Sequence, residues 1–293
     1  MNNKIIWLAS YPKSGNTWLR YLISNYFFNS ERKFNFKIAK AIKNFPTEDH
    51  MKFIVNRSEI IKNPYSISNY WIQAQEELKI KSTQFLNQSN LQLNTAFLKT
   101  HNALVSINNN SFTNEDLSLA IIQIVRDPRD VVISYANFAN SSYDEIIGEM
   151  TSDKLMYRID KSIDPPRVQI PGSWKFHYLS WKTGVPTIPR ILVKYEDLLR
   201  NTEDEFYRII KFLSEILNFK INMEQLKFSI EFSSFKILSK SEKKYGFFHE
   251  IKNDRPFFHK GTKNQWQEKL SQLQINKIEN NFKDEMRLLG YLK

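Results

Sequence analysis

A short polar segment near the start of the chain, Ser10–Trp18, has the composition of a phosphate-binding site. It reads SYPKSGNTW and lies between an apolar run, Ile5–Ala9, and apolar residues at helical spacing. Backbone N–H groups at the start of a helix point at a bound anion, a glycine such as Gly15 lets the anion come close, and Lys13 adds positive charge. We therefore predict an anion-binding loop between a strand and a helix.

The spacing of Lys13 and Gly15 separates this loop from that of the nucleoside triphosphatases. In their pattern, GxxxxGK[ST], the lysine directly follows the last glycine, whereas Lys13 precedes Gly15 by two positions. The loop is P-loop-like, but its pattern is a different one.

Further polar residues follow segments that read as strands. These segments are Phe97–Thr100, Leu119–Val125 and Ile191–Val193, of which Leu119–Val125 is a continuous apolar run suited to a strand buried on both faces. The residues that come after them are His101, Arg126 and Tyr195. Ligands bind beyond the carboxyl ends of parallel strands, so we expect these side chains and the loop to converge on one cleft.

Helical patterns alternate with the strands and must hold them in place. One begins after Pro128, and two more cover 68–81 and 275–289. Another begins at about Thr202, where Thr202 and Glu205 form a capping-box pattern. The alternation predicts an α/β fold with a mainly parallel central sheet flanked by helices. We expect a single domain over residues 1–293, in which the polar, aromatic segment 31–95 is an insertion contributing to an acceptor pocket.

Two more segments of the chain contain basic and polar residues, as the loop does. Val125–Tyr135 reads VRDPRDVVISY, and Phe257–Trp266 reads FFHKGTKNQW. Together with YPKSGNTW, they resemble motifs of the sulfotransferases that use 3′-phosphoadenosine 5′-phosphosulfate (PAPS). The resemblance implies the P-loop-like sulfotransferase fold. It also implies transfer of a sulfuryl group from PAPS to a hydroxyl or amine of a small acceptor, with release of 3′-phosphoadenosine 5′-phosphate (PAP).

The resemblance also implies which residues bind the donor. The loop corresponds to the 5′-phosphosulfate site, Arg126 and Ser134 to the 3′-phosphate site, and several aromatic residues to the adenine site. In the third segment, His259 replaces the usual arginine. The implied donor-binding residues are Lys13, Ser14, Gly15, Asn16, Thr17, Trp18, Arg126, Ser134, Tyr195, Ser233, Phe235, His259, Lys260 and Gly261. Independently of any family, Arg126 could instead pair with Asp130.

Three residues are the expected catalytic groups. His101 matches the family's catalytic histidine, and an imidazole titrates near neutrality, as a general base should. Lys13 would stabilise charge on the bridging oxygen, and Lys99 would assist. A sulfuryl group carries less charge than a phosphoryl group, so we expect no metal requirement, and the five histidines lack metal-ligand spacing.

Composition leaves other functions open. The formal charge of +11 would also suit a basic module that binds nucleic acid or a membrane surface, although no block of five or six like charges stands out. A nucleotide-dependent kinase and a family member that binds PAP without catalysis are further alternatives. We expect a small-molecule acceptor and no nucleic-acid partner. The acceptor's identity and the oligomeric state are not readable from the sequence.

Two further expectations concern the location of the protein and the walls of the acceptor pocket. The chain has no cysteine and no apolar segment long enough to span a membrane, so we expect a soluble, cytoplasmic protein. The stretches 30–95 and 141–173 mix aromatic and polar residues, and we expect them to wall the acceptor pocket. Tyr143, Met150, Met156 and Trp174 are candidate wall residues.

Overall fold

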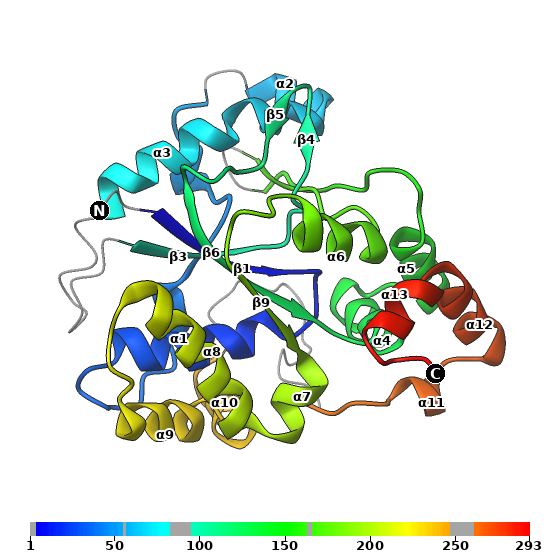
Figure 1. The fold of residues 1–293 in the computed structure, drawn as a ribbon. Coiled ribbons are helices and arrows are strands. Elements are labelled where there is room, and N and C mark those ends of the chain that lie inside the picture. Colours follow the sequence, from blue (N-terminus) through cyan, green and yellow to red (C-terminus); the bar gives the residue numbers. More distant parts are fainter. Residues whose placement is uncertain (1–3, 55–56, 83–94, 163–165, 247–260) are drawn as a thin grey trace. The chain divides into compact units, whose positions relative to one another are not determined.

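The computed structural model describes residues 4–54, 57–82, 95–162, 166–246 and 261–293 (Figure 1). The chain forms two compact units. The first, here called the sheet unit, comprises Met1–Pro12, Ile42–Val125 and Glu149–Leu192. The second, the helical unit, comprises Lys13–Ala41, Arg126–Gly148 and Val193–Lys293. The expectation of one domain with an insertion at 31–95 stays a prediction.

A five-stranded sheet with the order β2-β3-β1-β6-β9 organises the fold (Figure 1). Its strands are β1 (Lys4–Ser10), β2 (Lys43–Asn44), β3 (Thr95–Thr100), β6 (Ser118–Val125) and β9 (Arg190–Lys194). Strand β1 runs parallel to both β3 and β6, with Ala9 opposite Thr100 and Ser10 opposite Ile124. Side chains from Ile5 to Ser10 are all buried, as expected for a central strand covered on both faces. The predicted mainly parallel sheet is confirmed.

Aromatic packing around Trp7 forms the core of the sheet unit. The Trp7 ring lies 5.5 Å from Phe45, 5.2 Å from Phe112 and 6.3 Å from Trp181, centroid to centroid. These four rings are fully buried, and each large ring removes much apolar surface from water. The rigid packing of β1 fixes the strand end that leads into the polar loop.

Short elements complete the sheet unit. The helices are α2 (Arg57–Lys62), α3 (Trp71–Ser82) and α6 (Trp174–Thr183), with 3₁₀ turns at Glu48–His50 and Pro64–Tyr70. Two hairpins pair β4 (Ser106–Ile107) with β5 (Asn110–Ser111) and β7 (Arg158–Asp160) with β8 (Arg167–Gln169). Helix α5 (Tyr143–Met150) ends at the start of this unit's last segment. The expected helix at 68–81 thus begins as a 3₁₀ turn and becomes α3 at Trp71.

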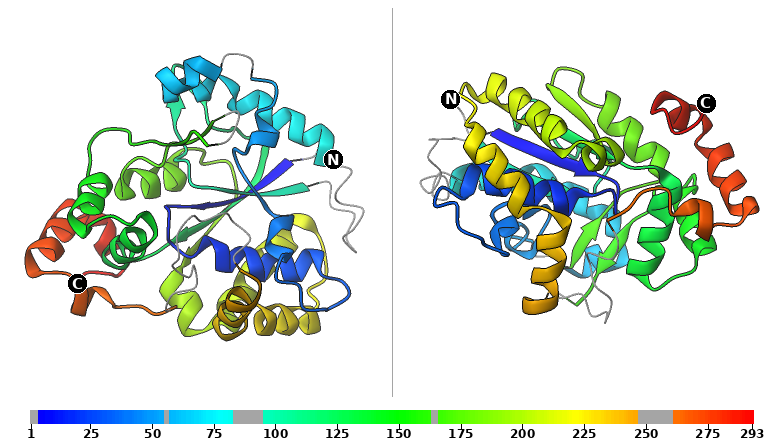
Figure 2. Two further views of the ribbon diagram at one scale, coloured as in Figure 1. Left: turned by 180° about the vertical axis from the view of Figure 1, so that it is seen from behind. Right: turned by 90° about the horizontal axis from the view of Figure 1, so that it is seen from below.

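The helical unit contains α1 (Asn16–Phe28), a 3₁₀ turn (Ile38–Ala41), α4 (Pro128–Ala139), α7 (Tyr195–Arg200), α8 (Thr202–Leu217), α9 (Met223–Phe232), α10 (Phe235–Tyr245), α11 (Trp266–Lys269), α12 (Gln272–Asn281) and α13 (Lys283–Leu288). Helix α9 packs against α1, and both lie close to α10 in Figures 1 and 2. Helix α4 has Pro128 in its first turn, and the Asp127 side chain caps it by accepting a hydrogen bond from the Arg129 N–H.

Two details of the expected helices are wrong. Thr202 is the first residue of α8, and Asn201 is the cap that accepts from the Asp204 N–H, while the Thr202 hydroxyl bonds Leu198 O. The expected helix over 275–289 is divided into α12 and α13 at Phe282, whose φ of −121° is not helical. Over the described ranges, no helix is long and apolar enough to cross a bilayer.

Candidate functional site

The loop between β1 and α1 has the backbone that its sequence predicts. Gly15 precedes α1 with φ 96°, and its carbonyl accepts from the N–H groups of Trp18 and Leu19 at 3.1 and 3.2 Å. Lys13 has φ 66°, a left-handed conformation that costs a non-glycine residue about 1–3 kcal/mol and often marks a functional site. The Ser14 hydroxyl is buried and lacks a hydrogen-bond partner within the described ranges.

The ammonium of Lys13 lies against an aromatic ring. Its Nζ is 4.3 Å from the centroid of Phe138 in α4, a distance typical of a cation–π contact. Burial, with a further contribution from the positive charge of Arg126, lowers the pKa of Lys13 to about 7, and Glu242 opposes the shift. With this pKa, both the charged and the neutral form of Lys13 are populated near neutral pH.

Arg126, which follows β6, is buried beside Lys13 and holds two loops. Its Nη1 donates to Lys13 O at 3.3 Å, and its Nη2 donates to Thr262 O at 3.1 Å. The guanidinium lies over the Tyr195 ring, with Cζ 4.5 Å from the centroid. Its Nε has no hydrogen-bond partner in the part of the chain that the structure describes. A buried donor without a partner is costly, which favours an anion at this position.

The alternative pairing of Arg126 with Asp130 is present only as a long contact. The two side chains approach to 3.9 Å. Asp130 instead accepts from the N–H groups of Asn264 and Trp266, at 2.7 and 3.2 Å. Burial raises the pKa of Asp130, and the positive charge of Arg126 opposes that shift. Asp130 thus fastens the segment after Gly261 to the start of α4.

Trp18, Tyr195 and Ser233 come together in the helical unit. The rings of Trp18 and Tyr195 meet edge to face at 5.9 Å, and the Trp18 indole N–H donates to Ser233 O at 2.9 Å. Asn25 donates to the Ser233 hydroxyl at 3.1 Å, which fixes the turn before α10. Aromatic faces held in this way can stack on a nucleobase.

Phe235, the first residue of α10, packs against Gly261. A Cβ added to Gly261 would lie 2.5 Å from the Phe235 ring, and Gly261 has φ +60°, so the position requires glycine. The Phe235 side chain keeps 36% of its surface exposed. Ser134 lies half-buried in α4. The predicted ligands His259 and Lys260 lie outside the described residues.

Arg129 organises a supporting network that sequence reasoning missed. It donates to the Asp127 carboxylate at 2.6 Å, to Glu279 at 2.5 Å and to Tyr291 O at 3.1 Å, and it lies 3.8 Å from the Trp266 ring centroid. The only local sign was the charge alternation in RDPRD. The network joins the start of α4 to α12 and to the end of the chain.

His101 lies in the sheet unit, directly after β3. Its Nδ1 is 2.7 Å from Ser10 O and 3.2 Å from Ser10 Oγ. A carbonyl oxygen only accepts, so Nδ1 carries the proton and Nε2 has the lone pair. That tautomer leaves Nε2 able to accept a proton. Lys99 is buried in β3, opposite Leu8 of β1.

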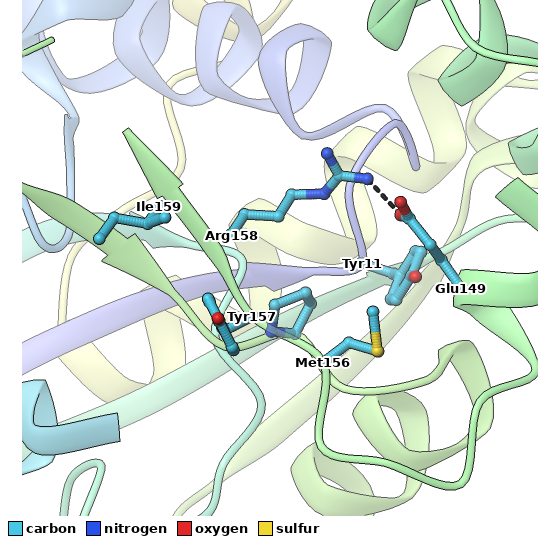
Figure 3. Close-up of a pocket in the computed structure, with 7 residues that line it drawn as sticks. Tyr11, Glu149, Met156, Tyr157, Arg158 and Ile159 are labelled. Atoms are coloured by element: carbon cyan, nitrogen blue, oxygen red, sulfur yellow. Dashed lines mark hydrogen bonds and ion pairs between the residues drawn. The ribbon is translucent and has the colours of Figure 1, made fainter. Parts of the chain in front are cut away.

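The sheet unit also contains a cavity of about 250 Å³ (Figure 3). The residues that line it are Tyr11, Glu149, Met156, Tyr157, Arg158, Ile159 and Pro171. Of the expected wall residues, Met156 lines this cavity, whereas Met150 and Trp174 are buried in the core. The expectation that all candidate residues share one cleft stays a prediction.

Taken by itself, the helical unit contains groups that could hold an anion and an aromatic base. The loop supplies helix N-terminal N–H groups, and Trp18 and Tyr195 supply rings. Ser14 Oγ and Arg126 Nε are among the buried side-chain atoms that have no hydrogen-bond partner within the described residues. Among the described residues, no group of three or more acidic or histidine side chains could hold a metal ion.

Comparison with known proteins gives one consistent result. The model of the sulfotransferase domain family matches residues 3–290. The amine sulfotransferase of Oryctolagus cuniculus is 21% identical over 96% of this chain and 80% of its own length. A mouse sulfotransferase crystallised with PAP has a TM-score of 0.54 at 20% identity, covering 98% of this chain and 84% of that one. Retinol dehydratase in complex with retinol and PAP has a TM-score of 0.59 at 17% identity, covering 98% and 82%.

Proposed function

Since the chain belongs to the sulfotransferase family, we propose that it moves a sulfuryl group from PAPS to a hydroxyl or amine of a small acceptor and releases PAP. The observation that carries the assignment of the donor site is the arrangement around Arg126. This buried guanidinium joins the Lys13 loop to the segment after Gly261 and keeps one donor, Nε, without a partner among the described residues. Bound donor phosphates would satisfy such groups.

In this proposal the helical unit binds the donor. The loop Lys13–Thr17 and the N-terminus of α1 hold the 5′-phosphosulfate. Arg126 and Ser134 hold the 3′-phosphate. Gly261 is assigned to the same phosphate, together with His259 and Lys260, which lie outside the described residues. The adenine lies against aromatic rings and the Ser233 turn, and the residues assigned to it are Trp18, Tyr195, Ser233 and Phe235.

The reaction would be an in-line displacement at sulfur. The acceptor oxygen or nitrogen forms a bond to sulfur while the bond from sulfur to the bridging oxygen of the donor breaks, and the electron pair leaves with PAP. His101 Nε2 takes the acceptor proton, and the bond from Nδ1 to Ser10 O holds the ring in the required tautomer. Lys13 stabilises the charge that grows on the bridging oxygen, and Lys99 assists. No step calls for a metal ion.

The other functions that the sequence leaves open differ in their support. Neither a nucleotide-dependent kinase nor a basic nucleic-acid or membrane-surface module is supported by the family match. A member that binds PAP without catalysis would retain PAP binding and show no sulfuryl transfer. We further propose a cytoplasmic location, which suits the absence of cysteine from the sequence.

Thermal melting with and without PAP tests the donor site. At a PAP concentration of about 100 Kd, ligand binding adds about 2.7 kcal/mol of stability, which corresponds to a Tm increase on the order of 5 °C. Lys13→Met should lose most of this increase. Lys211→Met, the same change at an exposed position of α8, should keep it. A wild-type Tm that excess PAP leaves unchanged would sink the proposal.

A further inference from the structure

The cavity of the sheet unit differs from an apolar acceptor pocket because an ion pair forms part of its wall. Arg158 of β7 donates to the carboxylate of Glu149, at the end of α5, as the dashed line in Figure 3 shows. Each of the two side chains is 39% exposed. An ion pair this open to solvent contributes only about 0–1 kcal/mol to stability. Its main consequence is chemical, since it presents a strong donor and a strong acceptor side by side.

Two tyrosines give the same cavity fixed aromatic surfaces. Tyr11 follows β1 and is buried edge-on against His177, with the rings 5.8 Å apart. The Tyr157 ring packs against the Tyr65 ring, with 5.3 Å between their centroids, and the Tyr65 hydroxyl donates to Leu155 O. Figure 3 shows Tyr11 and Tyr157 on the cavity wall together with the ion pair. The buried Tyr11 ring can pack on the C–H face of a ligand without large loss of entropy, and the more exposed Tyr157 ring adds further aromatic surface.

The size of the cavity limits what it can take. A volume of about 250 Å³ is just below the range of about 300–1,000 Å³ that is usual for pockets of drug-sized ligands. The cavity is thus suited to a ligand of about one ring. An apolar ring of this size would cover the carboxylate and the guanidinium and give them no hydrogen bonds in return, which is unfavourable.

The charges of Glu149 and Arg158 further limit the class of ligand that the cavity can bind. A carboxylate ligand would be attracted by Arg158 and repelled by Glu149, and an ammonium ligand would meet the opposite balance. A neutral ligand with several hydroxyl groups can donate to Glu149 and accept from Arg158 at once, and its C–H face can pack on a tyrosine ring. This combination gives hydrogen bonds to both charged groups on the wall without breaking the ion pair.

The cavity is also linked to the proposed base within the same unit. Tyr11 directly follows Ser10, whose carbonyl oxygen accepts from His101 Nδ1 at 2.7 Å. The β1 end that positions the His101 ring thus continues into the cavity wall.

Resting on the function proposed above, we infer that this cavity binds the acceptor. The acceptor class it selects is a neutral polyhydroxylated ring of monosaccharide size, read by Glu149 and Arg158. One hydroxyl of the ring is sulfated, and the others are recognised by the ion pair.

The test measures transfer from radiolabelled PAPS to a panel of acceptors. The panel holds methyl glycosides, N-acetylglucosamine and inositol as polyols, 2-naphthol as an apolar phenol, benzylamine as a cation and serine as a zwitterion. The inference predicts that kcat/KM is highest for a polyol. Glu149→Gln and Arg158→Gln should each lower kcat/KM for that polyol about 10- to 100-fold, the usual worth of a hydrogen bond to a charged group.

Arg167→Gln is the matched control. Arg167 pairs with Asp160 at 3.4 Å in the same hairpin but lies off the cavity wall, so its loss should change kcat/KM by less than about 2-fold. PAP binding to all three variants should equal that of the wild type. Faster turnover of 2-naphthol, benzylamine or serine than of every polyol overturns the inference, and so does turnover of none of the panel by a protein that binds PAP. Failure of PAP to bind would instead refute the proposed donor site.

Discussion

The lowered pKa of Lys13 predicts that donor binding is coupled to proton uptake. In the protein without donor, burial first and Arg126 second lower this pKa to about 7. The phosphates of PAP would bring negative charge to the ammonium and so raise its pKa in the complex. A group whose pKa rises on binding must take up protons whenever the pH lies between its two pKa values.

The size of the effect follows from the pKa. At about pH 8, an amine of pKa about 7 is only about 10% protonated. If the bound phosphates keep the amine fully protonated, PAP binding takes up about 0.9 proton. For the same reason, PAP affinity should fall about 50-fold between about pH 7 and pH 9, a change of about 2.3 kcal/mol. The second ionisation of a phosphate lies near pKa 6, so PAP itself contributes little in this range.

Isothermal titration calorimetry measures this uptake directly. PAP is titrated at about pH 8 into the protein in two buffers of different ionisation enthalpy, and the difference in binding enthalpy gives the protons exchanged. Lys13→Met should abolish the proton uptake. Lys211→Met, the same substitution at an exposed residue of the same unit, should preserve it. The reasoning is refuted if the wild type takes up less than about 0.2 proton, or if Lys13→Met takes up as many protons as the wild type.

Three further predictions concern other residues of the two units. His101→Ala should lower kcat about 100- to 10,000-fold, as expected for loss of a general base, while PAP affinity by calorimetry stays unchanged; equal loss of PAP binding would contradict a role as base. Gly261→Ala forces a Cβ to within 2.5 Å of the Phe235 ring at φ +60°, so PAP affinity should fall about 10-fold, and unchanged affinity would separate this glycine from the donor site. Burial lowers the pKa of His177 to about 3 in the folded chain, whereas in the unfolded chain this histidine binds a proton below about pH 6.5. The free energy of unfolding should therefore fall as the pH drops from about 6.5 towards 3. At about pH 5 the loss is about 2 kcal/mol by urea unfolding, and His177→Gln should remove this part of the pH dependence; an unchanged dependence in the variant would assign it to other groups.

Local features of the sequence predicted the central part of the fold well. The continuous apolar run Ile5–Ala9 can only be buried on both faces, and a loop containing proline and glycine must separate it from the helical pattern that follows. The same reasoning located β3, β6 and the residues after them. Burial and backbone period are properties of neighbouring residues, so one sequence suffices to recognise them.

Boundaries were less predictable because neighbouring residues offer similar caps. Asn201 and Thr202 are adjacent, and both side chains can cap a helix, so the pattern allowed either. At Phe282 the apolar spacing continues although the backbone leaves the helix, and spacing alone gives no sign of that break.

Contacts between distant residues could not be read from the sequence at all. Arg129 meets Glu279 and Tyr291, and Trp18 meets Ser233, across more than a hundred residues of chain in each case. Glu149 and Arg158 are separated by a loop of no regular period. Such pairs depend on how packed elements lie in space, and only the resemblance to a family suggested any of them.

The most direct test of the proposed sulfuryl transfer quantifies PAP and sulfated acceptor in the same reaction with PAPS. Purified protein is incubated with radiolabelled PAPS and the acceptor panel, with and without a chelator of divalent ions. The account predicts one PAP for each sulfated acceptor, at a rate that the chelator leaves unchanged and that Lys13→Met abolishes. PAP formation without any sulfated acceptor, or no PAP formation with any acceptor, would contradict it.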